Sequence, residues 1–180
     1  MKRVMLALCI VMCACENNIQ QVRNLGKKNV LPEDAHQVDI YLSQSGKMKA
    51  RLQAPFMLRY AADTPRIVFP NTLHSDFYDT LLNITSYLDA HYGVYYENMN
   101  KVYLNENVRI VNIVKKDTIY CEDLYWDQNA GRFYTHRLVE IHSPDQLIKG
   151  KGMTSNEDFS DVHIDSIYQT TFLFRNGQLN

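Results

Sequence analysis

The chain has 180 residues, of which 46% are hydrophobic and 22% are charged, and its formal net charge is −1. These values are ordinary for a single globular domain and exclude collagen-like, coiled-coil and wholly disordered chains. The near-neutral charge also argues against nucleic acid as a partner, because phosphate recognition needs a basic stripe.

Residues 1–14 have the pattern of a secretory signal peptide. Lys2 and Arg3 precede an apolar run over residues 4–12, which is too short to span a bilayer. The run ends in Met-Cys-Ala-Cys at 12–15, which resembles a bacterial lipobox, so Cys15 is expected to carry lipid. An uncleaved anchor is the alternative. In both cases the protein leaves the cytoplasm and stays at a membrane, because the acyl chains of a processed lipoprotein bury enough methylenes for stable anchoring.

Residues 15–35 are polar and predict a tether, and residues 36–180 predict the folded domain. Cys121 is the only cysteine in the second segment. A single cysteine excludes an intramolecular disulfide or a thiolate-rich zinc site within the domain. Cys121 is therefore expected to be a small buried hydrophobic residue.

Beyond the tether, short runs rich in Val, Ile, Tyr and Thr alternate with turn-forming segments. This regular spacing is typical of a sandwich or barrel-like sheet stack. The turn-forming segments are 45–46, 62–65, 105–107, 115–117, 129–131, 143–145 and 156–158. A long helical period is not convincing anywhere in the chain, and residues 76–88 are the best, weak candidate.

One pattern occurs four times. It consists of an apolar residue, a small residue two positions later and another apolar residue three positions after the small one. The small residues are Ala54, Ala90, Cys121 and Gly150, although the last position of the second copy is Gly93. We interpret the copies as stacked β-hairpins with small residues where neighbouring layers approach closely. A plain β-sandwich with similar hairpins is the alternative.

Several further motifs occur in a fixed order between residues 38 and 167. They are residues 45–55, 69–70, 77–78, 90–97, 107–108, 122–127 and 150–156. In order and spacing they resemble the LptC family, a periplasmic component of the lipopolysaccharide export machinery, which shares its repeat with OstA-type domains. The resemblance implies an all-β stack of hairpins that forms an open, twisted jelly-roll or sandwich groove. Members of that family often carry a transmembrane helix, whereas this chain has a lipobox.

The function implied by the resemblance is to accept lipopolysaccharide from an inner-membrane ABC transporter and to pass it to an LptA-like bridge protein. Such a carrier has no catalysis, cofactor or metal of its own. It is expected in the periplasm, held at the inner membrane by lipid on Cys15.

Acyl chains would need a dry groove, for which apolar, small and aromatic residues on one strand face are candidates. The same residues could instead fill an ordinary core. The candidates are Leu52, Ala54, Phe69, Leu88, Ala90, Val108, Ile110, Ile119, Cys121, Ile148 and Gly150. Hand-off to partners by main-chain pairing would use open strand edges, expected at 37–42 and 170–175, with Val38, Ile40, Phe172 and Phe174 as candidate residues.

Two other functions compete with this interpretation. A periplasmic or surface β-sandwich lipoprotein with a filled core could bind protein or glycan. An Asp/Glu hydrolase is remote, because the six His form no HExxH pair and the chain has no GxSxG motif. Lys47, Lys49 and Arg51 alternate on one strand face, where they could meet lipid phosphates or simply be solvated.

Overall fold

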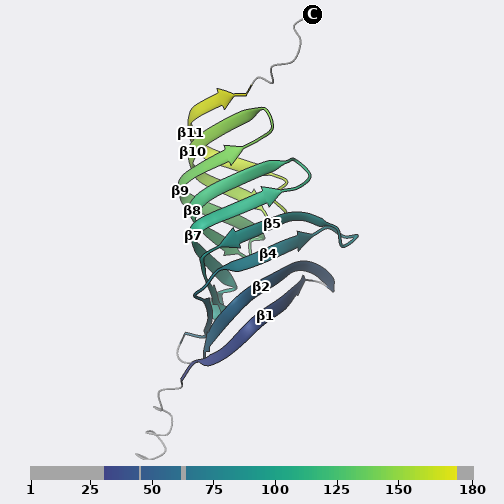
Figure 1. Ribbon diagram of the computed structural model, residues 1–180, viewed down its shortest axis with the longest axis vertical. Coiled ribbons are helices and arrows are strands. Elements are labelled where there is room, and N and C mark those ends of the chain that lie inside the picture. The colour runs from purple at the N-terminus through teal and green to yellow at the C-terminus, as the bar shows by residue number, and fades with distance from the viewer. Residues whose placement is uncertain (1–30, 45, 62–63, 174–180) are drawn as a thin grey trace, which may run out of the picture. The chain divides into compact units, whose positions relative to one another are not determined.

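The computed structural model describes residues 31–44, 46–61 and 64–173 (Figure 1). Within these ranges the elements are eleven strands and one 3-10 helix, η1 (Glu97–Met99), and every strand pairing is antiparallel. The strands are β1 (Glu33–Gln44), β2 (Lys47–Tyr60), β3 (Arg66–Phe69), β4 (Leu73–Tyr78), β5 (Ile84–Ala90), β6 (Tyr92–Tyr96), β7 (Lys101–Asn112), β8 (Asp117–Asp127), β9 (Arg132–His142), β10 (Gln146–Asn156) and β11 (Val162–Phe172). The all-β prediction is confirmed.

Two sequence expectations differ from this arrangement. The helix considered for 76–88 is wrong, since β4 and β5 occupy this region with a turn between them. Leu73, Ser75 and Phe77 are buried at every second position, which is the period of a strand. At the start of the domain, β1 begins at Glu33, within the residues expected to form the tether, and the compact unit that contains all the strands begins at Pro32.

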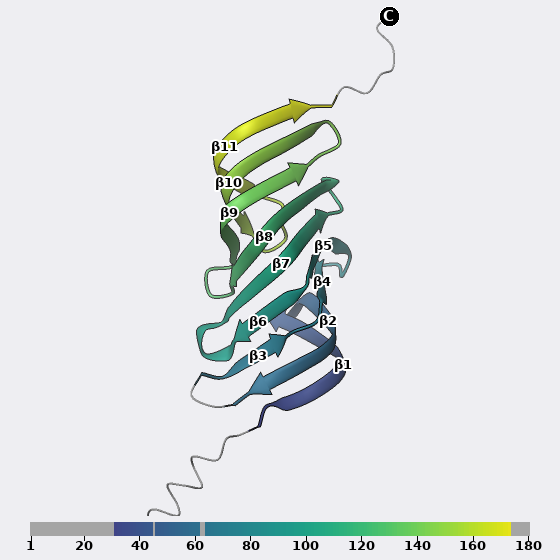
Figure 2. The same ribbon diagram turned by 60° about the vertical axis from the view of Figure 1, so that its left-hand side comes forward.

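The strands form one sheet that is folded back on itself into two walls (Figures 1 and 2). β3 and β4 act together as one bent strand, because both pair with β2, and β5 and β6 do the same beside β7. The chain is thus a meander of long hairpins. Wall A contains residues 33–36, 57–60, 66–69, 92–96, 101–105, 124–127, 132–135, 153–156 and 162–164, and wall B contains 38–44, 47–54, 73–78, 84–90, 108–112, 117–121, 139–142, 146–150 and 166–172.

Each long strand bends where it passes from one wall to the other, along what we call the bend line. Register shifts mark this position between Asn105 and Val108 of β7, between Cys121 and Tyr125 of β8, and between Lys151 and Met153 of β10. Glu106 and Asn107 have φ of 66° and 54°, so the bulge turns the strand without ending it. The segment 105–107, expected to be a turn, is this bulge.

The four copies of the sequence pattern lie at equivalent positions, on the strands that run from wall B to wall A. Their small residues, Ala54, Ala90, Cys121 and Gly150, are the last inward residues before the bend. At Gly150 a Cβ atom would lie 2.8 Å from the main-chain oxygen of Ser166, so this position needs a residue without a side chain. The repeated pattern therefore marks the bend line.

The inward side chains of the two walls form a single hydrophobic core. On β8 the inward set changes from Ile119 and Cys121 to Leu124 and Trp126, because the bulge shifts the alternation by one residue. Thr135 and Asp123 are buried at the bend, where the Thr135 hydroxyl donates a hydrogen bond of 2.5 Å to the carboxylate. This bond satisfies two polar groups that would otherwise destabilise the core.

Candidate functional site

An apolar cavity of about 110 Å³ lies between the two walls in the N-terminal half of the sheet. Its lining is apolar apart from Ser75, Gln128 and the hydroxyl of Tyr95. From wall B it is lined by Ile40, Leu42, Leu52, Leu73, Ser75, Phe77 and Leu88, and from wall A and the turn after β8 by Ile67, Phe69, Tyr95, Val102, Leu104, Trp126, Gln128 and Phe133. Apolar cavities of about 150 Å³ stay dry and accept a benzene-sized molecule. The cavity therefore has room for a short length of hydrocarbon.

The residues expected to line a groove divide between this cavity and the core. Leu52, Phe69 and Leu88 line the cavity. The other candidates are in the core or pack against it, and none of them lines the cavity. They are Ala54, Ala90, Val108, Ile110, Ile119, Cys121, Ile148 and Gly150. The C-terminal half of the space between the walls is filled by side chains, whereas the N-terminal half retains space.

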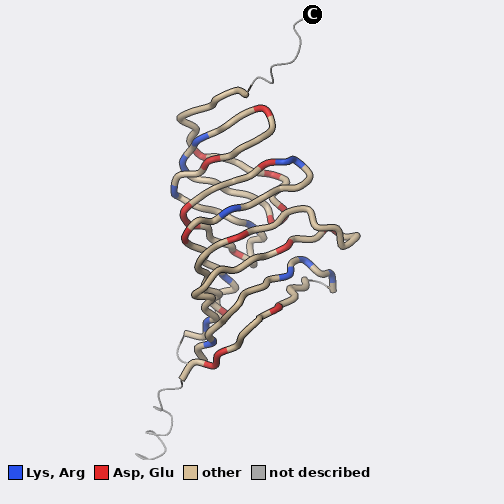
Figure 3. Tube along the Cα trace, viewed as in Figure 1, with Lys and Arg blue, Asp and Glu red and all other residues tan. Residues whose placement is uncertain are grey.

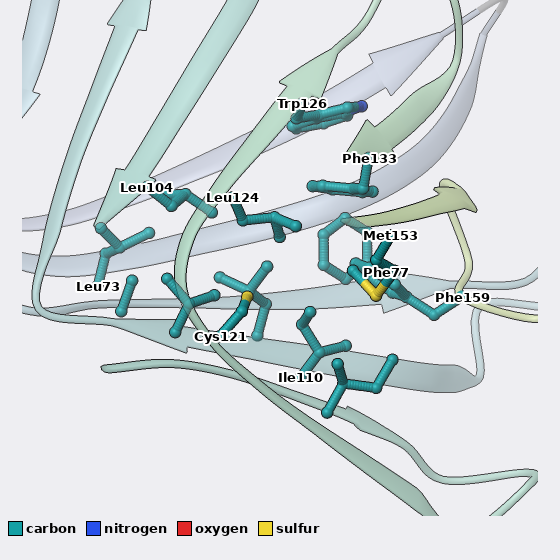
Figure 4. Packing of buried hydrophobic residues seen from close by; sticks show 14 of the residues in the cluster. Leu73, Phe77, Leu104, Ile110, Cys121, Leu124, Trp126, Phe133, Met153 and Phe159 are labelled. Carbon is teal, nitrogen blue, oxygen red and sulfur yellow. The ribbon is translucent and has the colours of Figure 1, made fainter. Parts of the chain in front are cut away.

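Phe159, in the turn between β10 and β11, fills the space between the walls beside this cavity. Its side chain is fully buried, its ring stacks on Phe133 of wall A at 4.6 Å, and it meets Phe77 of wall B edge-on at 5.6 Å (Figure 4). Its main-chain oxygen accepts a 2.9 Å hydrogen bond from the side chain of Asn112, at the end of wall B. The turn thus bridges the two walls on the side opposite the bend line.

A second hollow, of about 250 Å³, opens between the free ends of the walls, and we call it the mouth. Lys47, Lys49 and Tyr78 line it from wall B, and Trp126 and Glu157 line it from the other side. The Trp126 indole donates a 3.1 Å hydrogen bond to Glu157. The mouth shares Phe77 and Trp126 with the lining of the apolar cavity, so the two hollows are adjacent.

Sequence reasoning missed most of the cavity lining, above all Tyr95, Phe133 and Trp126. Alternation along the strands could have found Phe133, because Thr135 on the same face is also buried. Phe159 gave no such signal, since it lies in the polar segment 156–161, which reads as an exposed turn. Its burial depends on contacts with residues far away in the sequence.

The outer face of wall B is charged rather than apolar. His74 lies between two carboxylates, 2.7 Å from Asp89 and 3.1 Å from Asp76, and Arg109 binds the other oxygen of Asp89 at 3.0 Å. Burial lowers the pKa of His74, but the hydrogen bonds to Asp89 and Asp76 outweigh it, so the pKa is raised above 6.5. Arg51, one of the alternating basic residues, pairs with Asp39 at 2.7 Å on this face. This face is a solvated surface.

A family model described as "Lipopolysaccharide-assembly, LptC-related" matches residues 4–172. The chain belongs to the LptC family. A comparison with curated proteins found no match. LptC proteins are periplasmic, membrane-associated components of lipopolysaccharide transport, and the folded sheet with its internal groove agrees with this membership.

The LptC fold of this chain leaves its first and last described strands at opposite ends of the sheet. Among the described strands, β1 pairs with β2 alone and β11 with β10 alone. Val38 and Ile40 are half-buried and turn inward against the core, whereas Phe172 is 63% exposed. Phe174 lies outside the described residues. Among the described residues, one main-chain edge of β1 and one of β11 therefore have no strand partner, and the use of 37–42 and 170–175 as partner edges stays a prediction.

The N-terminal predictions for this LptC chain, the signal peptide 1–14 and lipidation of Cys15, also lie outside the described residues. In the part of the chain that the structure describes, no helix has the length and hydrophobicity to cross a membrane. The same residues hold no group of three or more His, Cys, Asp or Glu side chains placed to bind a metal ion. Cys121 is buried and has no disulfide partner among the described residues, and burial raises its pKa to about 12, as expected for an inert hydrophobic residue.

Proposed function

We propose that this chain accepts lipopolysaccharide from an inner-membrane ABC transporter and passes it to the next periplasmic bridge protein, without catalysis of its own. The observation that carries the proposal is the apolar cavity between the walls, in a chain of the LptC family. Acyl chains enclosed there gain about 25 cal/mol for each Å² of apolar surface removed from water. Among the lining residues, only Ser75, Gln128 and Tyr95 present polar groups to the acyl chains.

Loading requires the walls to part. A cavity of about 110 Å³ holds a fraction of one acyl chain, whereas lipopolysaccharide carries several. The Phe159 turn occupies the adjoining space and bridges the walls through Asn112, so its displacement would extend the cavity toward β10 and β11. The energy needed for this displacement limits the affinity for cargo, which suits a carrier that must release its cargo.

Transfer to the partners would use the free edges of β1 and β11. An extended strand of a partner can pair with such an edge through main-chain hydrogen bonds, which aligns the two sheets and their grooves. Ile167 and Phe172 on β11 are 55% and 63% exposed, so a partner at this edge would also cover apolar side chains. Val38 and Ile40 would support the β1 edge from within, and Phe174 is proposed to extend the β11 edge.

The proposed anchor is lipid on Cys15, after cleavage of residues 1–14. Diacylation and an amide-linked chain together bury enough methylenes for stable membrane anchoring. The tether that follows would allow the domain to reach the transporter. Mass spectrometry of the N-terminal peptide of the mature protein tests this part separately.

The transport proposal is tested by photocrosslinking in cells, with a photoreactive residue in place of Phe69 in the cavity lining. We expect adducts with lipopolysaccharide that disappear when the transporter ATPase is inactivated. The control position is Phe56, which contacts His36, at a centroid distance of 4.9 Å, and does not line the cavity. Absence of lipid adducts at Phe69 in folded, membrane-bound protein would contradict the proposal and favour the alternative, a lipoprotein with a filled core that binds protein or glycan.

A further inference from the structure

The turns at the end of wall B away from the bend line carry apolar side chains that no described residue covers. In the turn between β4 and β5, Leu81 is 80% exposed and Leu82 is 60% exposed. In the turn between β7 and β8, Val114 is 74% exposed and Ile113 is 46% exposed. Single exposed hydrophobic residues are ordinary on a protein surface, whereas exposed apolar residues that form a contiguous patch mark an interaction site.

These two turns are neighbours, so their side chains form one surface. β5 pairs with β7, and the Ile113 amide donates a 2.9 Å hydrogen bond to the carbonyl of Thr85. Figure 1 shows both turns projecting from the same side of the sheet, next to the turn between β1 and β2. We call the exposed surface formed by Leu81, Leu82, Ile113 and Val114 the tip surface.

Lysines flank the tip surface on both sides. Lys115 and Lys116 follow Val114 directly, and Lys47 and Lys49 lie on the neighbouring strand β2 (Figure 3). All four are exposed, and none forms a salt bridge with another described residue. The carboxylate of Asp79 accepts hydrogen bonds within its own turn, from the amides of Leu81 and Asn83 at 2.8 and 2.9 Å.

We propose that the tip surface inserts into the interface of an anionic lipid bilayer, as a contact separate from the N-terminal anchor. Apolar side chains bordered by lysines are the combination that such an interface favours, because the chains enter the acyl boundary while the ammonium groups meet phosphates. Lys47 and Lys49 also line the mouth, so this contact holds the mouth at the membrane surface. The two turns of the tip surface connect β4 to β5 and β7 to β8, and β5 pairs with β7 in the sheet.

The test uses the full chain in vesicles and a genetically encoded environment-sensitive fluorophore at a single position. One sample carries it at Leu82 and a matched sample carries it at Tyr168 on β11, since these two side chains are 60% and 59% exposed. Vesicles of pure phosphatidylcholine are compared with vesicles that contain phosphatidylglycerol. Because the N-terminal segment can bind both kinds of vesicle, the readout is the depth of the probe and not attachment of the protein.

We expect the Leu82 probe to shift to shorter wavelength and to be quenched several-fold by nitroxide lipids when phosphatidylglycerol is present, while the Tyr168 probe stays in water. Lys115→Glu should remove most of this quenching, and Lys151→Glu, which changes net charge equally at an exposed site on β10, should leave it unchanged. Equal quenching at both positions, or equal loss in both variants, would overturn the proposal. So would a Leu82 probe already shielded without lipid, which would indicate a protein partner or a second copy instead.

Discussion

Replacement of Phe159 by Ala tests whether a turn residue holds the two walls together. The Phe159 ring is fully buried and contacts Phe133 and Phe77, which belong to opposite walls. Truncation of a buried Phe to Ala costs about 3–5 kcal/mol, including the cavity that remains. We expect the upper part of this range only if the turn cannot collapse into the space, and the lower part if it relaxes.

For a domain of this size, a loss of about 3 kcal/mol lowers the melting temperature by about 10 °C. Denaturant unfolding can be followed by the fluorescence of Trp126, the only tryptophan, whose ring lies 5.1 Å from Phe133. Phe172→Ala is the control, because that Phe is 63% exposed and its loss should change stability by less than about 0.5 kcal/mol.

The same Phe159→Ala variant should increase uptake of lipopolysaccharide per folded molecule, since the apolar space it creates adjoins the cavity beside Phe77 and Phe133. Lipid bound to the purified variant is compared with lipid bound to the unmodified chain at a temperature where both are folded. Equal stability of Phe159→Ala and Phe172→Ala would refute the bridging role. Strong destabilisation of Phe159→Ala with no gain in bound lipid would support the bridging role of Phe159 and contradict its role as a barrier to lipid.

Three further results follow from single contacts. Gly150→Ala should lower the free energy of unfolding by about 1–3 kcal/mol and raise hydrogen exchange in β11, because the new Cβ would meet the main chain of Ser166. In Gly93→Ala the new Cβ would meet the movable ends of Leu side chains, so the loss should be smaller. Equal losses in the two variants would contradict the packing at the bend line. In urea titrations, His74→Gln should lose more stability at pH 5.5 than at pH 8.5. Because the pKa of His74 is raised in the folded state, its protonation stabilises the fold below pH 6.5, and this gain is lost as the pH rises through the pKa of the folded protein. The opposite trend would contradict the bonds to Asp89 and Asp76. Cys121 should not be alkylated by iodoacetamide at pH 8 in the folded chain, and it should be modified in guanidinium. Rapid labelling of the folded chain would contradict this prediction, because it would show that the thiol is accessible.

The sequence was sufficient to predict the hairpins but not how they bend. Turn-forming segments such as 129–131 and 143–145 lie between strands as expected, because local backbone preferences decide a tight turn. The segment 105–107 is also polar and was also expected to be a turn, yet it bends β7 without ending it, since β8 continues to pair on both sides. Whether a polar triplet turns or bulges is decided by the neighbouring strand.

The turn at 79–83 shows a local signal that composition alone does not reveal. It contains neither Gly nor Pro, but the Asp79 carboxylate accepts hydrogen bonds from two amides and the side-chain amide of Asn83. These bonds also lower the pKa of Asp79. An Asp followed four residues later by Asn could have indicated this turn in place of the weak helical period.

The candidate groove was predicted as a set of inward residues, and all of them face the interior, but the position of the remaining space was not predictable. It depends on Phe159, which closes the C-terminal half from a turn, and on the partial burial of Ile40 and Leu52 near the β1 edge. Both are consequences of contacts between segments far apart in the sequence. Periodicity along one strand reports which side faces inward and carries no information on what lies opposite.

The most direct test of lipid between the walls compares two adjacent tyrosines of β6. Tyr95 lines the cavity, and Tyr96 is directed to the outer face, because successive residues of a strand point to opposite sides. A photoreactive phenylalanine derivative at either position replaces one aromatic ring with another of similar size. In purified full chain mixed with lipopolysaccharide, we predict adducts from position 95 and few or none from position 96. Equal yields at the two positions, or adducts only from position 96, would contradict lipid binding between the walls.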